Sequence, residues 1–338
     1  MEKVSLKALR VLGKHRMEIQ TFSVPEIGSS DVLVQVTACG ICGTDRHILH
    51  GEYPAKYPVV IGHEFCGKVV AVGEKVENVK IGDSVSINPN IVCGTCANCR
   101  EGTPHLCERM VALGVDLDGG LAPYCRVPAS QIYKLDPDND LIESCLAEPL
   151  SCILHGIDRL GVLAGTNAVV FGGGFIGQLM SQTLKLQGAV RVVIVEPQEH
   201  KRQAAKKLGF ETIDPTSKQG RRELDSLRGW DVTVDCAGAG QVLEECIRIT
   251  RPGGRILLFA AYPQGKAVSI VPHEIFRKEL KIIGSFTYPD TQIRALRLLS
   301  SNKLDLEPII SKIPLNYAPK LLNGELDHTV IKGVVTFE

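Results

Sequence analysis

A glycine-rich turn between an apolar strand and a helix limits most strongly what this chain can fold into. Residues 167–171 read as a buried strand, and Gly172, Gly174 and Gly177 follow it as G-x-G-x-x-G where a helix begins. The first glycine permits a tight turn, the second lets backbone approach a pyrophosphate, and the third lets helix and strand pack closely. Because a helix N-terminus favours negative charge, we expect this turn to bind a dinucleotide.

Apolar strands and helices alternate from about residue 151 onward. We expect strands at 167–171, 190–195, 231–236 and 255–261, and helices at 175–187, 199–208 and 242–250. This alternation predicts a parallel, doubly wound sheet. The first 150 residues instead show short β-branched segments between Gly and Pro, at 31–37, 66–72, 83–87 and 122–127, and after about residue 272 we expect a strand at 281–286 and a helix at 291–300. The first half predicts a barrel-like β domain, so the expected fold class is α/β plus β.

The second strand of the alternating region ends in Glu196. An acidic side chain there can accept hydrogen bonds from the adenosine ribose, and its charge repels a 2′-phosphate, which favours NAD over NADP. Phe175 and Ile176, inside the glycine motif, and Lys201 complete the predicted cofactor-binding set. Lys201 and Arg202 could weaken the preference for NAD. The alternative is a glycine-rich turn that binds no ligand.

Four of the twelve cysteines form a compact array. Cys93, Cys96, Cys99 and Cys107 are spaced C-x2-C-x2-C-x7-C. Two-residue spacers let successive thiolates converge on one ion, and four sulfurs complete a closed tetrahedron, which predicts a structural zinc lobe at residues 93–107. The alternatives are disulfides or free thiols, an iron–sulfur cluster, and a zinc-ribbon-like nucleic-acid module.

Composition excludes several classes of protein. A length of 338 residues suggests about two domains. Lysine plus arginine total 38, as do aspartate plus glutamate, so the formal net charge is zero and we expect no nucleic-acid partner. The apolar runs are too short for a membrane span, and residues 1–16 lack the apolar core of a signal peptide. We therefore expect no membrane partner and a cytoplasmic location.

Two motifs in the β-rich half place metal-competent side chains next to glycine. They are Gly40-Ile-Cys-Gly-Thr-Asp45, which contains Cys42, and Gly62-His-Glu64, which contains His63. Thiolate and imidazole are ligands that zinc readily takes. Together with the four-cysteine array and the glycine-rich turn, and in this order along nearly the whole chain, these motifs resemble the zinc-dependent medium-chain dehydrogenase/reductases.

The resemblance implies a GroES-like barrel catalytic domain with an inserted Rossmann domain. It places the catalytic domain at residues 1–150 and 275–338 and the NAD-binding domain at 151–274. It also implies a catalytic zinc at Cys42, His63 and Glu64. Glu148, in a Glu-Pro-Leu-Ser segment, stands where ordinary alcohol dehydrogenases carry a cysteine ligand and resembles the sorbitol dehydrogenase branch. Glu148 would act as a ligand or through water, and Cys152 is the competing ligand.

The resemblance further implies a route for the proton. A zinc-bound hydroxyl has a lowered pKa, so that a hydride can pass from its carbon to the nicotinamide. Thr44 resembles the hydroxyl that begins the family's proton relay, and His47 would carry the proton onward. Asp45 would orient His63. The alternatives are that Thr44 only caps a helix and that His47 is a surface histidine.

We therefore expect a zinc- and NAD-dependent oxidoreductase with two zinc ions per chain. Its expected substrate is a polyol-like small molecule with a secondary hydroxyl, such as a sugar alcohol, a cyclitol or an aminocyclitol. Ile48 and Thr287 make two substrate-contacting positions less polar than in sorbitol dehydrogenases. The alternatives are a simple alcohol dehydrogenase and a non-catalytic protein that binds NAD and zinc. The family suggests a homodimer or homotetramer, with residues 255–261 as an edge strand and 272–280 beside it as a contact surface.

Overall fold

The chain forms two compact units. The computed structural model describes residues 6–21, 23–262, 265, 267–326 and 329–337. Residues 1–5 of the N-terminal segment, which lacks the apolar core of a signal peptide, lie outside the described residues. Unit 1 comprises Met1–Ser151, Pro289–Asn302 and Ile310–Glu338, and unit 2 comprises Cys152–Tyr288 and Lys303–Ile309. No helix in these described ranges is both long and apolar enough to cross a membrane.

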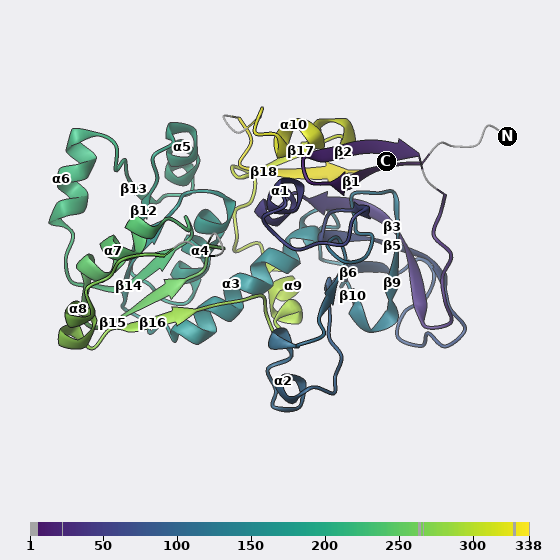
Figure 1. Ribbon diagram of the computed structural model, residues 1–338, viewed down its shortest axis with the longest axis horizontal. Helices are drawn as coiled ribbons and strands as arrows, with labels where there is room; N and C mark the ends of the chain where they lie inside the picture. Colours follow the sequence, from purple (N-terminus) through teal and green to yellow (C-terminus); the bar gives the residue numbers. More distant parts are fainter. Residues whose placement is uncertain (1–5, 22, 263–264, 266, 327–328, 338) are drawn as a thin grey trace. The chain divides into compact units, whose positions relative to one another are not determined.

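Unit 1 consists mainly of short strands (Figure 1). Its strands are β1 (Lys7–Gly13), β2 (Arg16–Thr21), β3 (Asp31–Gly40), β4 (Val59–Val60), β5 (Glu64–Val72), β6 (Ser84–Ile87), β7 (Asn90–Ile91), β8 (Val111–Ala112), β9 (Tyr124–Pro128), β10 (Ile132–Lys134), β17 (Ile310–Ile313) and β18 (Lys332–Thr336). Its α-helices are α1 (Gly43–His50), α2 (Ala97–Arg100), α9 (Gln292–Ser300) and α10 (Ala318–Leu322). Short 3-10 helices occur at Pro104–Leu106, Ala129–Gln131, Glu143–Leu146 and Leu315–Tyr317.

The largest sheet of unit 1 has the strand order β10-β6-β5-β3-β18-β17, with β9 also paired to β3. Over the first part of β3, buried and more exposed residues alternate, so one face of the strand packs into the core. That core includes Val34, Phe65 and Val335. β18 pairs antiparallel with β3 and places Val334 opposite Gly40. The last strand of the chain thereby reaches the segment that leads into Cys42.

Unit 2 contains six strands in one parallel sheet, together with the helices that connect them. The strands are β11 (Asn167–Phe171), β12 (Arg191–Val195), β13 (Glu211–Ile213), β14 (Trp230–Asp235), β15 (Thr250–Leu258) and β16 (Lys281–Gly284). The helices are α4 (Phe175–Leu186), α5 (Glu199–Lys207), α6 (Lys218–Ser226), α7 (Gly240–Ile249) and α8 (Pro272–Lys278), while α3 (Ala147–Leu160) begins in unit 1. Four of the five residues of β12 are buried, as expected for a strand covered on both faces. The doubly wound parallel sheet expected from the sequence is present.

The strand order β13-β12-β11-β14-β15-β16 changes direction between β11 and β14. Ligands of such sheets bind at this switch point, beyond the carboxyl ends of the strands. The glycine-rich turn follows β11, Glu196 follows β12 and Cys236 follows β14. The fold therefore gathers the expected cofactor-binding segments at one edge of the sheet.

The edge of this sheet differs from the sequence-based expectation. Residues 255–261 are expected to form the edge strand, but β15 has β14 on one side and β16 on the other. The edge strand on this side is β16, because it is the last strand in the order of the sheet and pairs there with β15. The main segment of unit 2, which includes β16, ends at Tyr288, whereas the expected NAD-binding domain ends at residue 274.

Candidate active site

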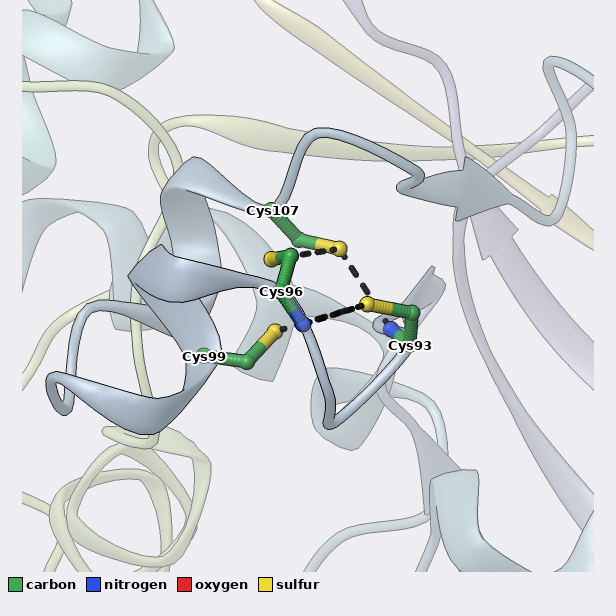
Figure 2. A group of neighbouring side chains, drawn as sticks. All are labelled: Cys93, Cys96, Cys99 and Cys107. Carbon is green, nitrogen blue, oxygen red and sulfur yellow. Dashed lines mark hydrogen bonds between the residues drawn. The ribbon is translucent and has the colours of Figure 1, made fainter.

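Cys93, Cys96, Cys99 and Cys107 lie together around the short helix α2 (Figure 2). Their sulfur atoms all lie within 4.8 Å of one another, with 4.0 Å between Cys93 Sγ and Cys99 Sγ. The sulfurs of Cys96 and Cys107 are 3.9 Å apart. Zinc–sulfur bonds of about 2.3 Å in a tetrahedron place two sulfurs about 3.8 Å apart. All twelve cysteines are free, so the arrangement fits one zinc ion held by four thiolates.

Hydrogen-bond donors surround Cys93. Its Sγ accepts from the backbone N–H groups of Thr95 at 3.5 Å and Cys96 at 3.3 Å, and from Arg109 Nη2 at 3.4 Å. The two backbone donors stabilise the thiolate and lower the pKa of Cys93 to about 5. Because the thiolate is the form that binds a metal, the lobe presents at least one ligand already deprotonated at neutral pH.

A second group of ligand-type side chains consists of Cys42, His63 and Glu64. One ligand atom of each residue lies within 4.8 Å of the other two. Cys42 is the N-cap residue of α1, and Glu64 begins β5 directly after His63. His63 is 7% exposed and Glu64 is fully buried. The fold therefore brings the two glycine-flanked motifs to one point in unit 1, where His63 and Glu64 are buried and Cys42 is partly exposed.

Asp45 ties these two motifs together. Its Oδ2 accepts from the backbone N–H of Cys42 at 2.8 Å, and its Oδ1 accepts from the backbone N–H of Gly62 at 3.2 Å. His63 Nδ1 lies 3.5 Å from the same Oδ1. Burial lowers the pKa of His63, but the negative charges of Cys42 and Asp45 outweigh burial and raise this pKa well above its usual value. The surroundings of His63 therefore favour a positive charge, which a bound cation would supply.

Glu64 has a charged neighbour that the sequence does not indicate. Lys332, on β18, forms a buried ion pair with Glu64 Oε2. Gly40 faces the same carboxylate, and a Cβ at that position would lie 2.1 Å from Oε2. Glu64 Oε1 is buried and accepts no hydrogen bond within the described part of the chain. A cation beside it would complete its interactions, and the sulfur, nitrogen and oxygen donors of the group fit zinc.

Thr44 and His47 lie one helical turn apart on α1. Thr44 Oγ1 is 3.6 Å from Cys42 Sγ, so its hydroxyl adjoins the ligand group. His47 is partly exposed, and its Nδ1 lies 2.7 Å from Glu52 Oε2. The structure therefore places Thr44 beside the expected metal site and His47 toward solvent.

Helix α3 carries the other two candidate ligands, Glu148 and Cys152. Glu148 is buried in the first turn of the helix, and Cys152 lies one turn later. Among the described residues, neither belongs to the group formed by Cys42, His63 and Glu64. Ile48, which the resemblance places in contact with substrate, is instead fully buried in the core of unit 1. That contact does not fit the structure, because no surface of Ile48 remains for a ligand.

The glycine-rich turn borders a cavity of about 700 Å³ in unit 2. Gly172 and Gly174 line it after β11, Glu196 and Lys201 line it after β12, and Cys236 lines it after β14. A cavity of this size falls in the range of small-molecule and cofactor sites. It lies at the switch point of the sheet, where the fold predicts a ligand.

Two of the motif glycines are required by the local geometry. Gly172 has a φ of 98°, in the region that side chains rarely adopt. A Cβ on Gly177 would lie 1.7 Å from the Gly172 carbonyl oxygen, so the start of α4 can pack there only with glycine. Phe175 and Ile176 begin α4 and, like Gly177, are not among the residues that line the cavity.

Glu196 is held at the cavity by backbone donors. Its Oε2 accepts from the Gly173 N–H at 2.7 Å, and its Oε1 accepts from the Gln198 N–H at 2.8 Å. Arg202 is buried and donates through Nη1 to the carbonyl oxygens of Glu196 at 2.9 Å and Pro197 at 2.6 Å. The guanidinium of Arg202 therefore holds the loop that carries Glu196.

Sequence reasoning missed three residues that shape these sites. Arg109 stands just after the cysteine array and Gly173 is the middle glycine of the turn, so each lies in or beside a motif that could have indicated it. Lys332 gives no such signal, because its partner Glu64 lies far away in the sequence.

Comparison with known proteins defines the class. Residues 28–137 match the family described as an alcohol dehydrogenase GroES-like domain, and residues 176–301 match the family described as a zinc-binding dehydrogenase. Together these matches span more than half of the chain. The chain therefore belongs to the zinc-dependent medium-chain alcohol and polyol dehydrogenase family, and the protein is an oxidoreductase acting on CH–OH groups. The expected combination of a GroES-like domain with a Rossmann domain is confirmed.

Individual relatives agree with this assignment. D-arabinitol dehydrogenase 1 from Uromyces fabae is 34% identical over 297 residues, which cover 86% of this chain and 85% of that protein. A provisionally named zinc-binding dehydrogenase from Sinorhizobium meliloti 1021, solved bound to NADP, is 35% identical with a TM-score of 0.94, covering 99% of this chain and 100% of its own. An Escherichia coli CFT073 protein named a short chain alcohol dehydrogenase, solved with NADH, is 27% identical with a TM-score of 0.91, at the same coverages. Zinc, a nicotinamide cofactor and a small-molecule substrate are thus features of this family.

Proposed function

We propose that this enzyme oxidises a secondary hydroxyl of a polyol-like substrate and transfers the hydride to NAD. The observation that carries the proposal is the group of Cys42, His63 and Glu64, in a chain whose other unit holds Glu196 at a nucleotide-type cavity. A metal site alone would also suit hydrolysis, and a nucleotide site alone would suit many reactions. The presence of both in one chain supports zinc-dependent hydride transfer.

We assign two zinc ions to each chain. One belongs to the four-cysteine lobe, and the other to Cys42, His63 and Glu64 in unit 1, which acts as the catalytic domain. Zinc bound in the second site supplies a Lewis acid that lowers the pKa of a substrate hydroxyl. The Thr44 hydroxyl, which adjoins Cys42, would accept the proton from the substrate hydroxyl and release its own proton toward His47, one helical turn later. The partly exposed ring of His47 would then pass a proton to water.

The cofactor preference is assigned from three side chains. Glu196 presents a carboxylate that can accept hydrogen bonds from ribose hydroxyls and repels a 2′-phosphate. Arg202 is occupied by backbone carbonyls and by the carboxylates of Glu199 and Asp214, so it is not free to bind a phosphate. Lys201 lines the cavity and is the cation that could soften the preference. This balance supports NAD over NADP.

The polyol class is assigned from Glu148 and from the relatives. Glu148 is a buried carboxylate in the same unit as the ligand group, and a carboxylate near the metal can accept a hydrogen bond from a second hydroxyl of the substrate. The relative named D-arabinitol dehydrogenase 1 supports a sugar alcohol. A simple alcohol offers no second hydroxyl for this contact.

A substrate panel tests the proposal. The purified, zinc-loaded enzyme is assayed for reduction of NAD and of NADP with arabinitol, xylitol, sorbitol, cyclitols and simple secondary alcohols. We expect the highest kcat/KM with NAD and a polyol or cyclitol. A preference for simple alcohols would favour the alternative of a simple alcohol dehydrogenase, and no reduction with any compound would contradict the proposal.

A further inference from the structure

Gln178 lies immediately after the glycine motif, in the first turn of α4, and is completely buried. Its Nε2 donates to the Gly173 carbonyl oxygen at 2.7 Å and to the Lys201 carbonyl oxygen at 3.2 Å. Gly173 belongs to the turn after β11, and Lys201 belongs to α5, which follows β12. One side-chain amide therefore joins two segments that are separate in the sequence.

The two joined segments carry groups that face the cavity. Gly172 lines it from the first segment, and Glu196 and Lys201 line it from the second. Glu196 also connects the two segments, because its Oε2 accepts a hydrogen bond from the Gly173 N–H at 2.7 Å. Gln178 makes a further link between the same segments, and it does so from behind the cavity rather than as a lining residue.

Burial of the Gln178 amide carries a free-energy cost at its oxygen atom. Gln178 Oε1 is buried and accepts no hydrogen bond within the described residues. An unsatisfied buried acceptor is destabilising, whereas leucine or methionine would fill a similar volume without it. What the glutamine contributes and an apolar residue cannot is the pair of hydrogen bonds from Nε2.

We propose that Gln178 is a positioning residue for the dinucleotide. Because its amide donates to the carbonyl groups of both Gly173 and Lys201, it fixes the spacing between the turn assigned to the pyrophosphate and the segment assigned to the adenosine ribose, which runs from Glu196 into α5. A ligand that contacts both loops needs that spacing in advance, so loosening it weakens binding although Gln178 does not touch the ligand. The inference rests on the proposed function, because that function assigns a dinucleotide to this cavity.

The test compares Gln178→Leu with a matched control, Gln182→Leu. Gln182 lies one turn further along α4 and is also buried. Its Nε2 donates to the Asp305 carbonyl oxygen at 2.9 Å, and its Oε1 accepts from the Asp305 N–H at 2.8 Å. Each substitution thus removes two hydrogen bonds of one buried glutamine from the same helix. The Kd for NADH is measured by fluorescence titration of zinc-loaded enzyme, and the free energy of unfolding is measured in denaturant.

We expect Gln178→Leu to raise the Kd for NADH about tenfold. Gln182→Leu is expected to lower stability and leave this Kd unchanged. ADP-ribose, which spans the pyrophosphate and the adenosine ribose, is expected to lose affinity for the Gln178 variant by the same factor. Gln178→Met, which keeps the length of the side chain, replaces the leucine variant if that variant does not fold.

The possible failures are distinguishable. Equal Kd values for the wild-type chain and a folded Gln178 variant would overturn the inference and leave the proposed function intact. An equal rise in Kd for the Gln178 and Gln182 variants would also overturn it, because the effect would then follow stability. A wild-type chain that binds neither NADH nor NADPH would overturn the proposed function and, with it, the inference.

Discussion

The ammonium group of Lys332 forms an ion pair with the carboxylate of Glu64, and neither side chain is more than 4% exposed. Glu64 adjoins Cys42 and His63, whereas Lys332 comes from the last strand of the chain. Removing one partner of a buried pair leaves the other charge uncompensated. Glu64 therefore has two potential partners, a lysine that is always present and a cation that can bind.

Lys332→Met is expected to destabilise the metal-free chain more than the zinc-loaded chain. Without the lysine, the buried Glu64 charge is uncompensated, which lowers the free energy of unfolding by about 3 kcal/mol. Zinc at the ligand group would restore part of this loss. Denaturant unfolding of both forms measures the difference, and the double variant with Glu64→Gln is the control, expected to recover most of the stability. Equal destabilisation with and without zinc would contradict a Glu64 that faces the ion.

Thr44→Val is expected to lower kcat at least about 100-fold, because it removes the hydroxyl that begins the proton path. Thr44→Ser keeps a hydroxyl and is expected to retain most of the activity. Zinc content and the Kd for NADH are measured in both variants and should match the wild type. If valine and serine give the same kcat, Thr44 has only a local structural role at the start of α1.

Glu196→Ala is expected to raise KM for NAD by roughly 10- to 100-fold, because hydrogen bonds to a charged group are lost. KM for NADP should change less or fall, since the repulsion of its 2′-phosphate is removed. Glu223, exposed on α6, provides the control Glu223→Ala. Steady-state kinetics with both cofactors measure the ratio. An unchanged ratio in the Glu196 variant would show that this carboxylate does not select the cofactor.

Cys93→Ser is expected to reduce the metal content from two zinc ions to one, because the four-cysteine lobe loses a ligand. The lobe at residues 93–107 should then become more sensitive to proteolysis, while the ligand group of Cys42 keeps its ion. Cys246 is buried in unit 2 and belongs to neither ligand group, so Cys246→Ser should retain both ions. Mass spectrometry and metal analysis give the counts. Two ions in the Cys93 variant would contradict a closed site of four sulfurs.

Much of the fold follows from local patterns in the sequence. The run at 168–171 is apolar and buried because β11 is covered on both faces, and the bounds of β11 are those expected. β15 was harder to locate, because it begins at Thr250 and includes Arg251-Pro-Gly-Gly, which resembles a turn. Its register with β14 shifts after Trp230, so this turn-like stretch is an irregularity within the strand. The pairing of β16 at the edge depends on contacts between distant segments, which no local pattern reveals.

Local motifs likewise indicate some residues of the candidate site, whereas others depend on contacts between distant segments. Cys42, His63 and Glu64 are near glycines in short motifs, and the spacing of the other four cysteines indicates a metal by itself. The contacts of Lys332 with Glu64 and of Gln178 with Lys201 join residues that are distant in sequence, so only the folded chain reveals them. The role of Glu148 as a zinc ligand stays a prediction, because among the described residues Glu148 does not belong to the group formed by Cys42, His63 and Glu64.

The central claim is that the ion held by Cys42, His63 and Glu64 is required for hydride transfer. Its most direct test is a paired measurement on Cys42→Ala, of zinc per chain and of NADH formation with the best substrate of the panel. We predict one zinc ion instead of two, an unchanged Kd for NADH, and loss of NADH formation. Wild-type turnover in a variant shown to carry only the four-cysteine ion would contradict the account.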